Sequence, residues 1–92
     1  MSLNPQSIPQ RNPEFRLEIL DQEIILLRPA DGKIVQCNQT AGAVWKLCDG
    51  TRSSSEIAAL FRDAYQEPGT DISADVYDAL ASLVDADVIR LQ

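Results

Sequence analysis

Residues 15–37 read FRLEILDQEIILLRPADGKIVQC, in which three short apolar segments are separated by turn residues. Phe15, Leu17 and Ile19 alternate with other residues, which predicts a half-buried strand. Residues 23–28 are almost continuously apolar, as is typical of a central strand. Asp31-Gly32 is a strong hairpin signal, so residues 33–37 are predicted to be a third strand. The stretch therefore predicts a three-stranded antiparallel meander whose third strand lies at an edge.

Three helices are predicted downstream of the meander. Asn38 can cap a first helix over 40–48, which ends at Asp49-Gly50. A second helix starts at the capping box formed by Ser53 and Glu56 and runs to about Tyr65. Its apolar face is Ile57, Leu60, Phe61, Ala64 and Tyr65. Pro68-Gly69 breaks the chain, and Asp71 or Ser73 caps a third helix that reaches about Asp85. Residues 88–91 could close the domain as a final strand or clamp.

The ends and the length set the domain organisation. Ninety-two residues suffice for one small core, and the chain has no apolar run long enough for a membrane span. Residues 1–13 hold three of the five prolines and little else apolar, which predicts a flexible N-terminal arm. Residues 14–92 are then the folded domain.

The charge distribution excludes some partners. Residues 1–52 carry six basic and six acidic side chains, whereas residues 53–92 carry two basic and eight acidic ones. The whole net charge of −6 therefore belongs to the C-terminal part. An acidic surface repels phosphate backbones and anionic lipid, so we expect neither a nucleic acid nor a membrane partner.

Catalytic and metal-binding residues are scarce. The chain has no histidine, and Cys37 and Cys48 are too far apart for a CxxC motif. Both cysteines are expected to be reduced and half-buried, which favours a cytoplasmic location. No nucleophile–base pair, phosphate-binding glycine loop or set of zinc ligands can be assembled from these residues. We expect a protein that is no enzyme and has no metal or cofactor.

The predicted third helix has three faces. At about 100° per residue, one face is a core stripe of Ile72, Val76, Ala79, Leu80 and Leu83. An apolar shoulder of Tyr77, Ala81 and Val84 lies beside it, and an acidic face lies opposite the core. The acidic face is Asp71, Asp75, Asp78, Ser82 and Asp85.

The shoulder and the edge strand are the candidate peptide-binding site. An open strand edge can accept a peptide strand, and an apolar shoulder can form the second wall of a groove. Two alternatives stay open: the shoulder is simply more core, or the edge pairs with the chain's own tail or with a second copy in a homodimer. The candidate residues are Lys33, Ile34, Val35, Gln36, Cys37, Tyr77, Ala81 and Val84.

The chain resembles the PqqD family, named for the pyrroloquinoline quinone biosynthesis protein D. The most specific block is N-x-x-A-x-x-V-W-x-L-x-D-G at 38–50, followed by Glu56-Ile57, and the resemblance covers residues 15–91. It implies an α+β, winged helix-turn-helix fold in which a three-stranded antiparallel meander precedes three helices. Many relatives have Leu where this chain has Cys37, and the third helix is unusually acidic.

The resemblance also implies a function. Family members look like non-catalytic chaperones that bind the leader of a ribosomally made precursor peptide as an added strand. They present it to a modifying enzyme, in the founding case a radical S-adenosylmethionine (SAM) enzyme. By this resemblance the site is the third strand, Lys33 to Cys37, with the shoulder Tyr77, Ala81 and Val84.

Two other functions are alternatives: one is compatible with the order of secondary-structure elements, and the other with the size of the chain. A winged-helix DNA-binding regulator is opposed by the acidic third helix, which would be its recognition helix. An acidic carrier domain would need a D-S-L motif at a helix start, and the nearest match, Ala81-Ser82-Leu83, lies late in a helix.

Overall fold

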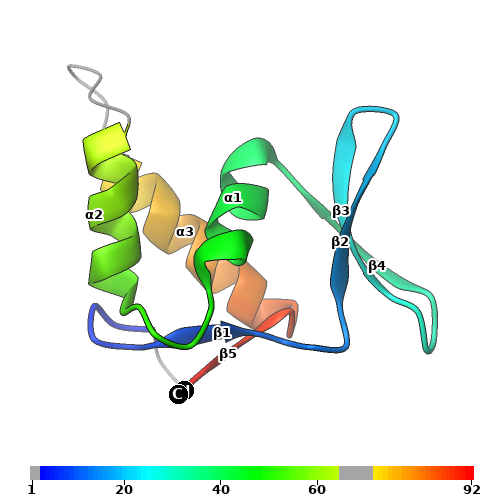
Figure 1. The fold of residues 1–92 in the computed structure, drawn as a ribbon, viewed down its shortest axis with the longest axis horizontal. Coiled ribbons are helices and arrows are strands. Elements are labelled where there is room, and N and C mark those ends of the chain that lie inside the picture. Colours follow the sequence, from blue (N-terminus) through cyan, green and yellow to red (C-terminus); the bar gives the residue numbers. More distant parts are fainter. Residues whose placement is uncertain (1–2, 65–71) are drawn as a thin grey trace.

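The computed structural model describes residues 3–64 and 72–92, and in them a three-stranded sheet precedes three helices. The sheet is an antiparallel meander with strand order β2-β3-β4, where β2 is Arg16–Leu20, β3 is Glu23–Arg28 and β4 is Lys33–Cys37. The expected central strand and edge strand are confirmed. Figure 1 shows the sheet projecting to one side of the three helices.

The two turns of the meander have the backbone geometry that the sequence predicts. Asp21 and Gln22 have φ values of 50° and 69°, as a tight two-residue hairpin turn requires. Gly32 follows Asp31 with a φ of 73°, which glycine adopts without steric cost. The expectation that Ile19 is half-buried is wrong, since its side chain is 64% exposed. Ile19 lies near the β2–β3 turn, which extends beyond the cover of the helices (Figure 1).

Helix α1, Gln39–Leu47, begins where β4 ends. The Asn38 side chain accepts the backbone N–H of Ala41 over 2.7 Å and caps the helix as expected. Cys48 is the C-cap, and Gly50 follows with a φ of 81°. Because only Asn38 separates β4 from α1, the end of the strand lies next to the first turn of the helix.

Helix α2, Ser54–Ala64, begins at the predicted capping box. The Ser53 hydroxyl accepts the backbone N–H of Glu56, and the Glu56 carboxylate accepts the backbone N–H of Ser53. These bonds lower the pKa of Glu56. Ile57 and Phe61 are buried as expected, whereas Leu60 is 45% exposed and Ala64 is exposed, so these two do not belong to the core. The expected end at Tyr65 and the Pro68-Gly69 break lie outside the described residues.

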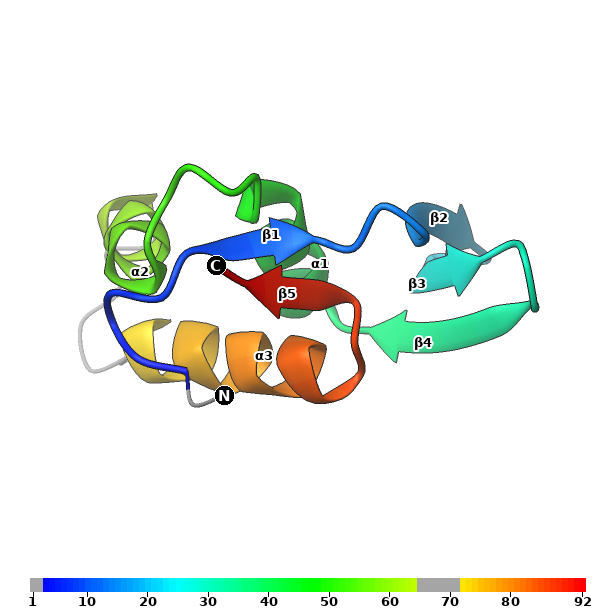
Figure 2. The same cartoon turned by 90° about the horizontal axis from the view of Figure 1, so that it is seen from below.

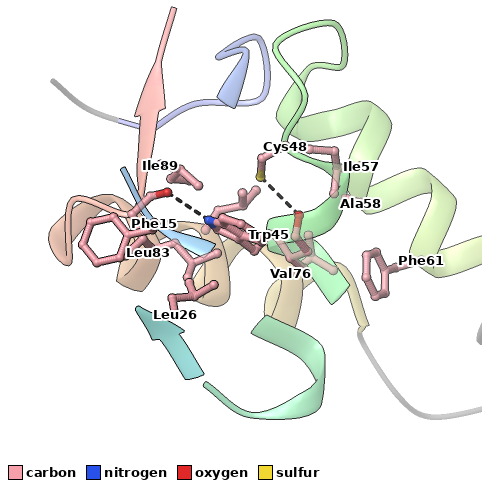
Figure 3. Packing of buried hydrophobic residues seen from close by; sticks show 13 residues of the cluster. Phe15, Leu26, Trp45, Cys48, Ile57, Ala58, Phe61, Val76, Leu83 and Ile89 are labelled. Carbon is pink, nitrogen blue, oxygen red and sulfur yellow. Dashed lines mark hydrogen bonds between the residues drawn. The ribbon is translucent and has the colours of Figure 1, made fainter. Parts of the chain in front are cut away.

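Helix α3, Ile72–Asp85, buries the predicted core stripe through Val76, Leu80 and Leu83. Ser73 lies inside the helix and is not its cap, and Asp71, the alternative cap, lies outside the described residues. Figure 3 shows Val76 and Leu83 meeting Trp45 of α1, Phe61 of α2 and Leu26 of β3 in one cluster. One core therefore joins the sheet to all three helices.

The expectation of a flexible arm over residues 1–13 is wrong for the residues that the structure describes. Strand β1, Pro9–Arg11, pairs antiparallel with β5, Ile89–Leu91, and Figure 2 shows this ribbon lying across the helices. Asn12 is fully buried, and its side chain donates to the carbonyl of Asp87 over 2.8 Å. The prolines do not oppose this packing, since Pro is tolerated in short edge strands. The predicted C-terminal strand is confirmed.

Candidate functional site: a groove between the edge strand and the third helix

A groove of about 500 Å³ lies between β4, the start of α1 and one face of α3. Its strand wall is Val35, Gln36 and Cys37, and its helix wall contains Asp75, Asp78, Ala79, Ser82 and Leu83. Asn38, Thr40 and Ala41 close the end where the strand turns into the helix. The buried and half-buried apolar lining residues, such as Val35, Ala79 and Leu83, form the floor of the groove, and the exposed Asp75, Asp78 and Ser82 form its rim.

The outer edge of β4 is the side of the strand that pairs with no other described strand. Among the described residues β4 pairs only with β3, from Ile24↔Cys37 to Arg28↔Lys33. An antiparallel strand uses alternate backbone groups on each side, so the second side of β4 presents N–H and C=O groups to the groove. A second extended chain could pair there.

The structure brings only part of the predicted site together. Val35, Gln36 and Cys37 line the groove, whereas Lys33 lies at the far end of β4. Ile34 does not line it either, and its side chain is 58% exposed.

Tyr77, Ala81 and Val84 do not line the groove. On a helix of about 100° per residue they lie roughly 150° from the middle of the groove-facing residues of α3. Tyr77 and Val84 are half-buried against the core, and Ala81 is exposed. Tyr77 and Val84 are therefore additional core cover, as one of the two sequence-based alternatives held for the shoulder. The acidic face, and not the shoulder, forms the groove wall.

The sequence interpretation thus missed Asp75, Asp78 and Ser82 as groove residues. These residues were grouped correctly on one face of the third helix, but an acidic face is usually only solvated. No local sequence pattern distinguishes the two faces, because tertiary packing fixes the side of α3 that lies beside β4.

The cysteine that lines the groove is not activated as a nucleophile. Cys37 is half-buried, and burial raises the pKa of its thiol, so it stays protonated and weakly reactive. Cys48 is fully buried, donates to the carbonyl of Val44 and has its pKa raised to about 12 by burial. Among residues 3–64 and 72–92, no three Cys, Asp or Glu side chains are arranged to hold a metal ion.

A second hollow, of about 510 Å³, lies between α1 and α2 and shares no lining residue with the groove. Leu47, Leu60 and Phe61 line it with Lys46 and Arg52 at its edge. Backbone groups inside a helix are already paired with each other, so this hollow offers side-chain contacts only.

No helix in the described part of the chain has the length and apolar character needed to cross a membrane.

The order of elements and the groove define a class of small α+β domains in which a free edge strand and a helix border an open channel. The chain belongs to the PqqD family, because the family model described as "Coenzyme PQQ synthesis protein D (PqqD)" matches residues 23–89. The matched part contains β3, β4 and all three helices. The resemblance of the 38–50 block is thereby confirmed.

One sequence relative and one solved structure support the assignment. The relative, from Methylococcus capsulatus, is named "PqqA binding protein" and is 30% identical over 92 residues, which cover 98% of this chain and 95% of the relative. The solution structure of the PqqD part of Methylobacterium extorquens PqqCD, described as a recognition element for ribosomally made and modified peptides, is 26% identical. It has a TM-score of 0.74 and covers 97% of this chain and 95% of its own.

Two further structures share the fold at lower identity. TbiB1 in complex with the TbiA(beta) leader peptide has a TM-score of 0.66 at 17% identity, over 88% of this chain and 94% of that one. A lasso peptide synthetase B1 complexed with its leader peptide has a TM-score of 0.68 at 22% identity, over 90% of this chain and 98% of that one. Both likenesses confirm the three-stranded sheet followed by three helices.

Proposed function

We propose that this chain is a non-catalytic adaptor that binds the leader of a precursor peptide in the groove between β4 and α3. The observation that carries the proposal is the outer edge of β4, which has no partner strand among the described residues and faces the groove. A guest strand would gain backbone hydrogen bonds from this edge and side-chain contacts from the groove floor.

The relatives support this function for the domain as a whole. One is named for binding PqqA, and two chains of the same fold were solved with leader peptides. The adaptor would then present the bound peptide to a modifying enzyme, and a radical SAM enzyme is our specific proposal for that partner. The pyrroloquinoline quinone pathway or a related peptide pathway would supply the precursor.

The charge of α3 argues against DNA binding as the function of this fold. The exposed face of α3 carries Asp75, Asp78 and Asp85, and none of them has an ion-pair partner among the described residues. These carboxylates would face the phosphate backbone if α3 entered a groove of DNA, and the repulsion would oppose binding.

The two cysteines provide a direct test. Cys37 lines the groove, whereas Cys48 is fully buried in the core. Alkylation of the native protein should therefore modify Cys37 slowly and leave Cys48 unmodified, as intact mass would show. Synthetic leader peptides encoded beside the gene are then added in increasing amounts.

A leader peptide that occupies the groove should slow the alkylation of Cys37 in proportion to binding, with Cys48 unmodified throughout. Denatured protein should take up two adducts with or without the peptide, which controls for quenching of the reagent. If every such peptide leaves the Cys37 rate unchanged at saturating concentration, the proposal is overturned.

A further inference from the structure

The helix wall of the groove carries carboxylates without cations. Asp75 and Asp78 line the groove from α3, and no Lys or Arg is among the lining residues that the structure describes. Neither carboxylate has an ion-pair partner among the described residues. By contrast, Asp31 and Glu14 pair with Arg28, and Asp49 pairs with Arg52. These carboxylates have a cation beside them, whereas the two carboxylates of the groove wall do not.

Local helix stability does not account for Asp78. It lies in the middle of α3, where Asp is a poorer helix former than Ala, Glu or Lys. It is three residues from Asp75, and like charges at this spacing repel each other. Asp78 is also too far from the helix N-terminus to gain from the helix dipole, which acts on the first turn. A ligand that contacts the groove would supply the missing counter-charge.

A strand added to β4 would bring its side chains to this wall. Alternate residues of the guest would face α3, above a floor that includes Val35, Ala79 and Leu83. Lys or Arg at the positions nearest Asp75 and Asp78 would form charge-assisted hydrogen bonds, while Asp or Glu there would be repelled.

We infer that the groove selects a basic peptide segment, in which Lys or Arg residues reach Asp75 and Asp78 and aliphatic residues pack on the floor. This inference rests on the proposed function and adds the chemical class of the peptide. Asp85 is the natural comparison, because it lies on the same helix, is exposed and does not line the groove.

A library of randomised peptides displayed on phage is selected for binding to the full chain, and the bound peptides are sequenced. The same selection is run on the Asp75→Asn/Asp78→Asn double variant and on Asp85→Asn. A Ser82→Trp variant, whose indole would fill the groove, identifies peptides that bind elsewhere. Peptides from the first pool are then synthesised with Lys or Arg replaced by Gln, and their affinities are compared.

We expect enrichment of Lys and Arg in the pool bound by the natural chain and by Asp85→Asn, and loss of this enrichment for the double variant. Each Asp→Asn change should weaken a basic peptide about threefold, the size typical of an exposed ion pair, with a smaller difference at high salt. Thermal unfolding of Asp78→Asn should show unchanged or slightly higher stability, so a loss of affinity would not reflect a loss of fold.

Two other outcomes have different meanings. Peptides that bind the natural chain but not the Ser82→Trp variant, and that show no preference for Lys or Arg, would overturn the charge selectivity. The proposed function would then still stand. Peptides that bind the Ser82→Trp variant as well as the natural chain would overturn both, since the groove would then not be the binding site.

Discussion

The indole N–H of Trp45 donates a hydrogen bond to the backbone carbonyl of Val88 over 3.0 Å, and the backbone N–H of Asn12 donates to the same carbonyl. One buried oxygen thus joins α1, the segment after α3 and the N-terminal segment. Figure 3 shows this bond inside the core, next to Ile89 and Leu83. The N-terminal segment is therefore part of the fold that supports the groove.

Replacing Asn12 by Ala should destabilise the domain by about 2 to 3 kcal/mol. The side chain is fully buried, donates to the Asp87 carbonyl and accepts the backbone N–H of Glu14, so both of those groups would lose a partner. Urea denaturation measures the change. Gln6→Ala is the matched control, since Gln6 is an exposed residue of the same segment. Equal stabilities of the two variants would contradict a stabilising role for the Asn12 side chain.

A bulkier residue at Gly42 should push α1 away from the sheet. A Cβ atom at Gly42 would lie 3.1 Å from Cγ2 and 3.3 Å from Cδ1 of Ile24. Gly42→Val should therefore cost about 1 to 3 kcal/mol of folding free energy, although helix propensity alone favours Val over Gly. In a double-mutant cycle with Ile24→Ala, the cost should shrink because the clashing atoms are gone. Strictly additive effects would contradict this packing.

The Asp31 carboxylate should titrate far below its ordinary range. Arg28 donates to both of its oxygens, over 3.0 and 2.8 Å, and lowers the pKa of Asp31 from 3.8 to about 2. Since the folded-state pKa is depressed, the pair's contribution to stability is present above pH 3.8 and is lost as the pH falls towards 2. Arg28→Gln should raise the pKa back towards 3.8, although the backbone N–H of Lys33 would still donate to the carboxylate and lower it in part; carboxyl NMR titration measures the change. An unchanged pKa in that variant would contradict the assignment to Arg28.

Filling the groove should abolish peptide binding, whereas a change one residue away should not. Ser82→Trp places an indole in the groove, and Ala81→Trp places the same group on the exposed surface outside it. We expect the first variant to weaken binding by at least about tenfold through steric exclusion, and the second to bind normally. Calorimetric titration with a bound leader peptide measures both. The opposite result would restore the shoulder of α3 as the binding face.

Much of the fold is predictable from local signals in the sequence. The meander follows from Asp31-Gly32 and the alternating segments, and the first two helix starts follow from Asn38 and the Ser53–Glu56 box. These signals act over a few residues, so they do not depend on tertiary packing. The pairing of β1 with β5 is different, because it joins residues about eighty positions apart and has no local sequence pattern.

The candidate site was predictable only in part. The free edge of β4 follows from its place as the last strand of a meander, and Val35 to Cys37 line the groove accordingly. Two faces of α3 flank its core stripe, and the sequence alone does not say which of them forms the helix wall of the groove. Apolar character favoured the side of Tyr77 and Val84, but burial against the core explains those residues. Only the packing of α3 beside β4 identifies Asp78 and Ser82 as the wall.

Amide hydrogen exchange on β4, with and without a bound leader peptide, tests strand addition most directly. In the free protein the N–H groups on the outer edge of Lys33–Cys37 should exchange fast, while those paired to β3 exchange slowly. With a leader peptide bound, the fast amides of β4 should become protected, and Asp75 to Leu83 of α3 should show chemical shift changes. Binding that leaves every fast amide of β4 unprotected would contradict strand addition.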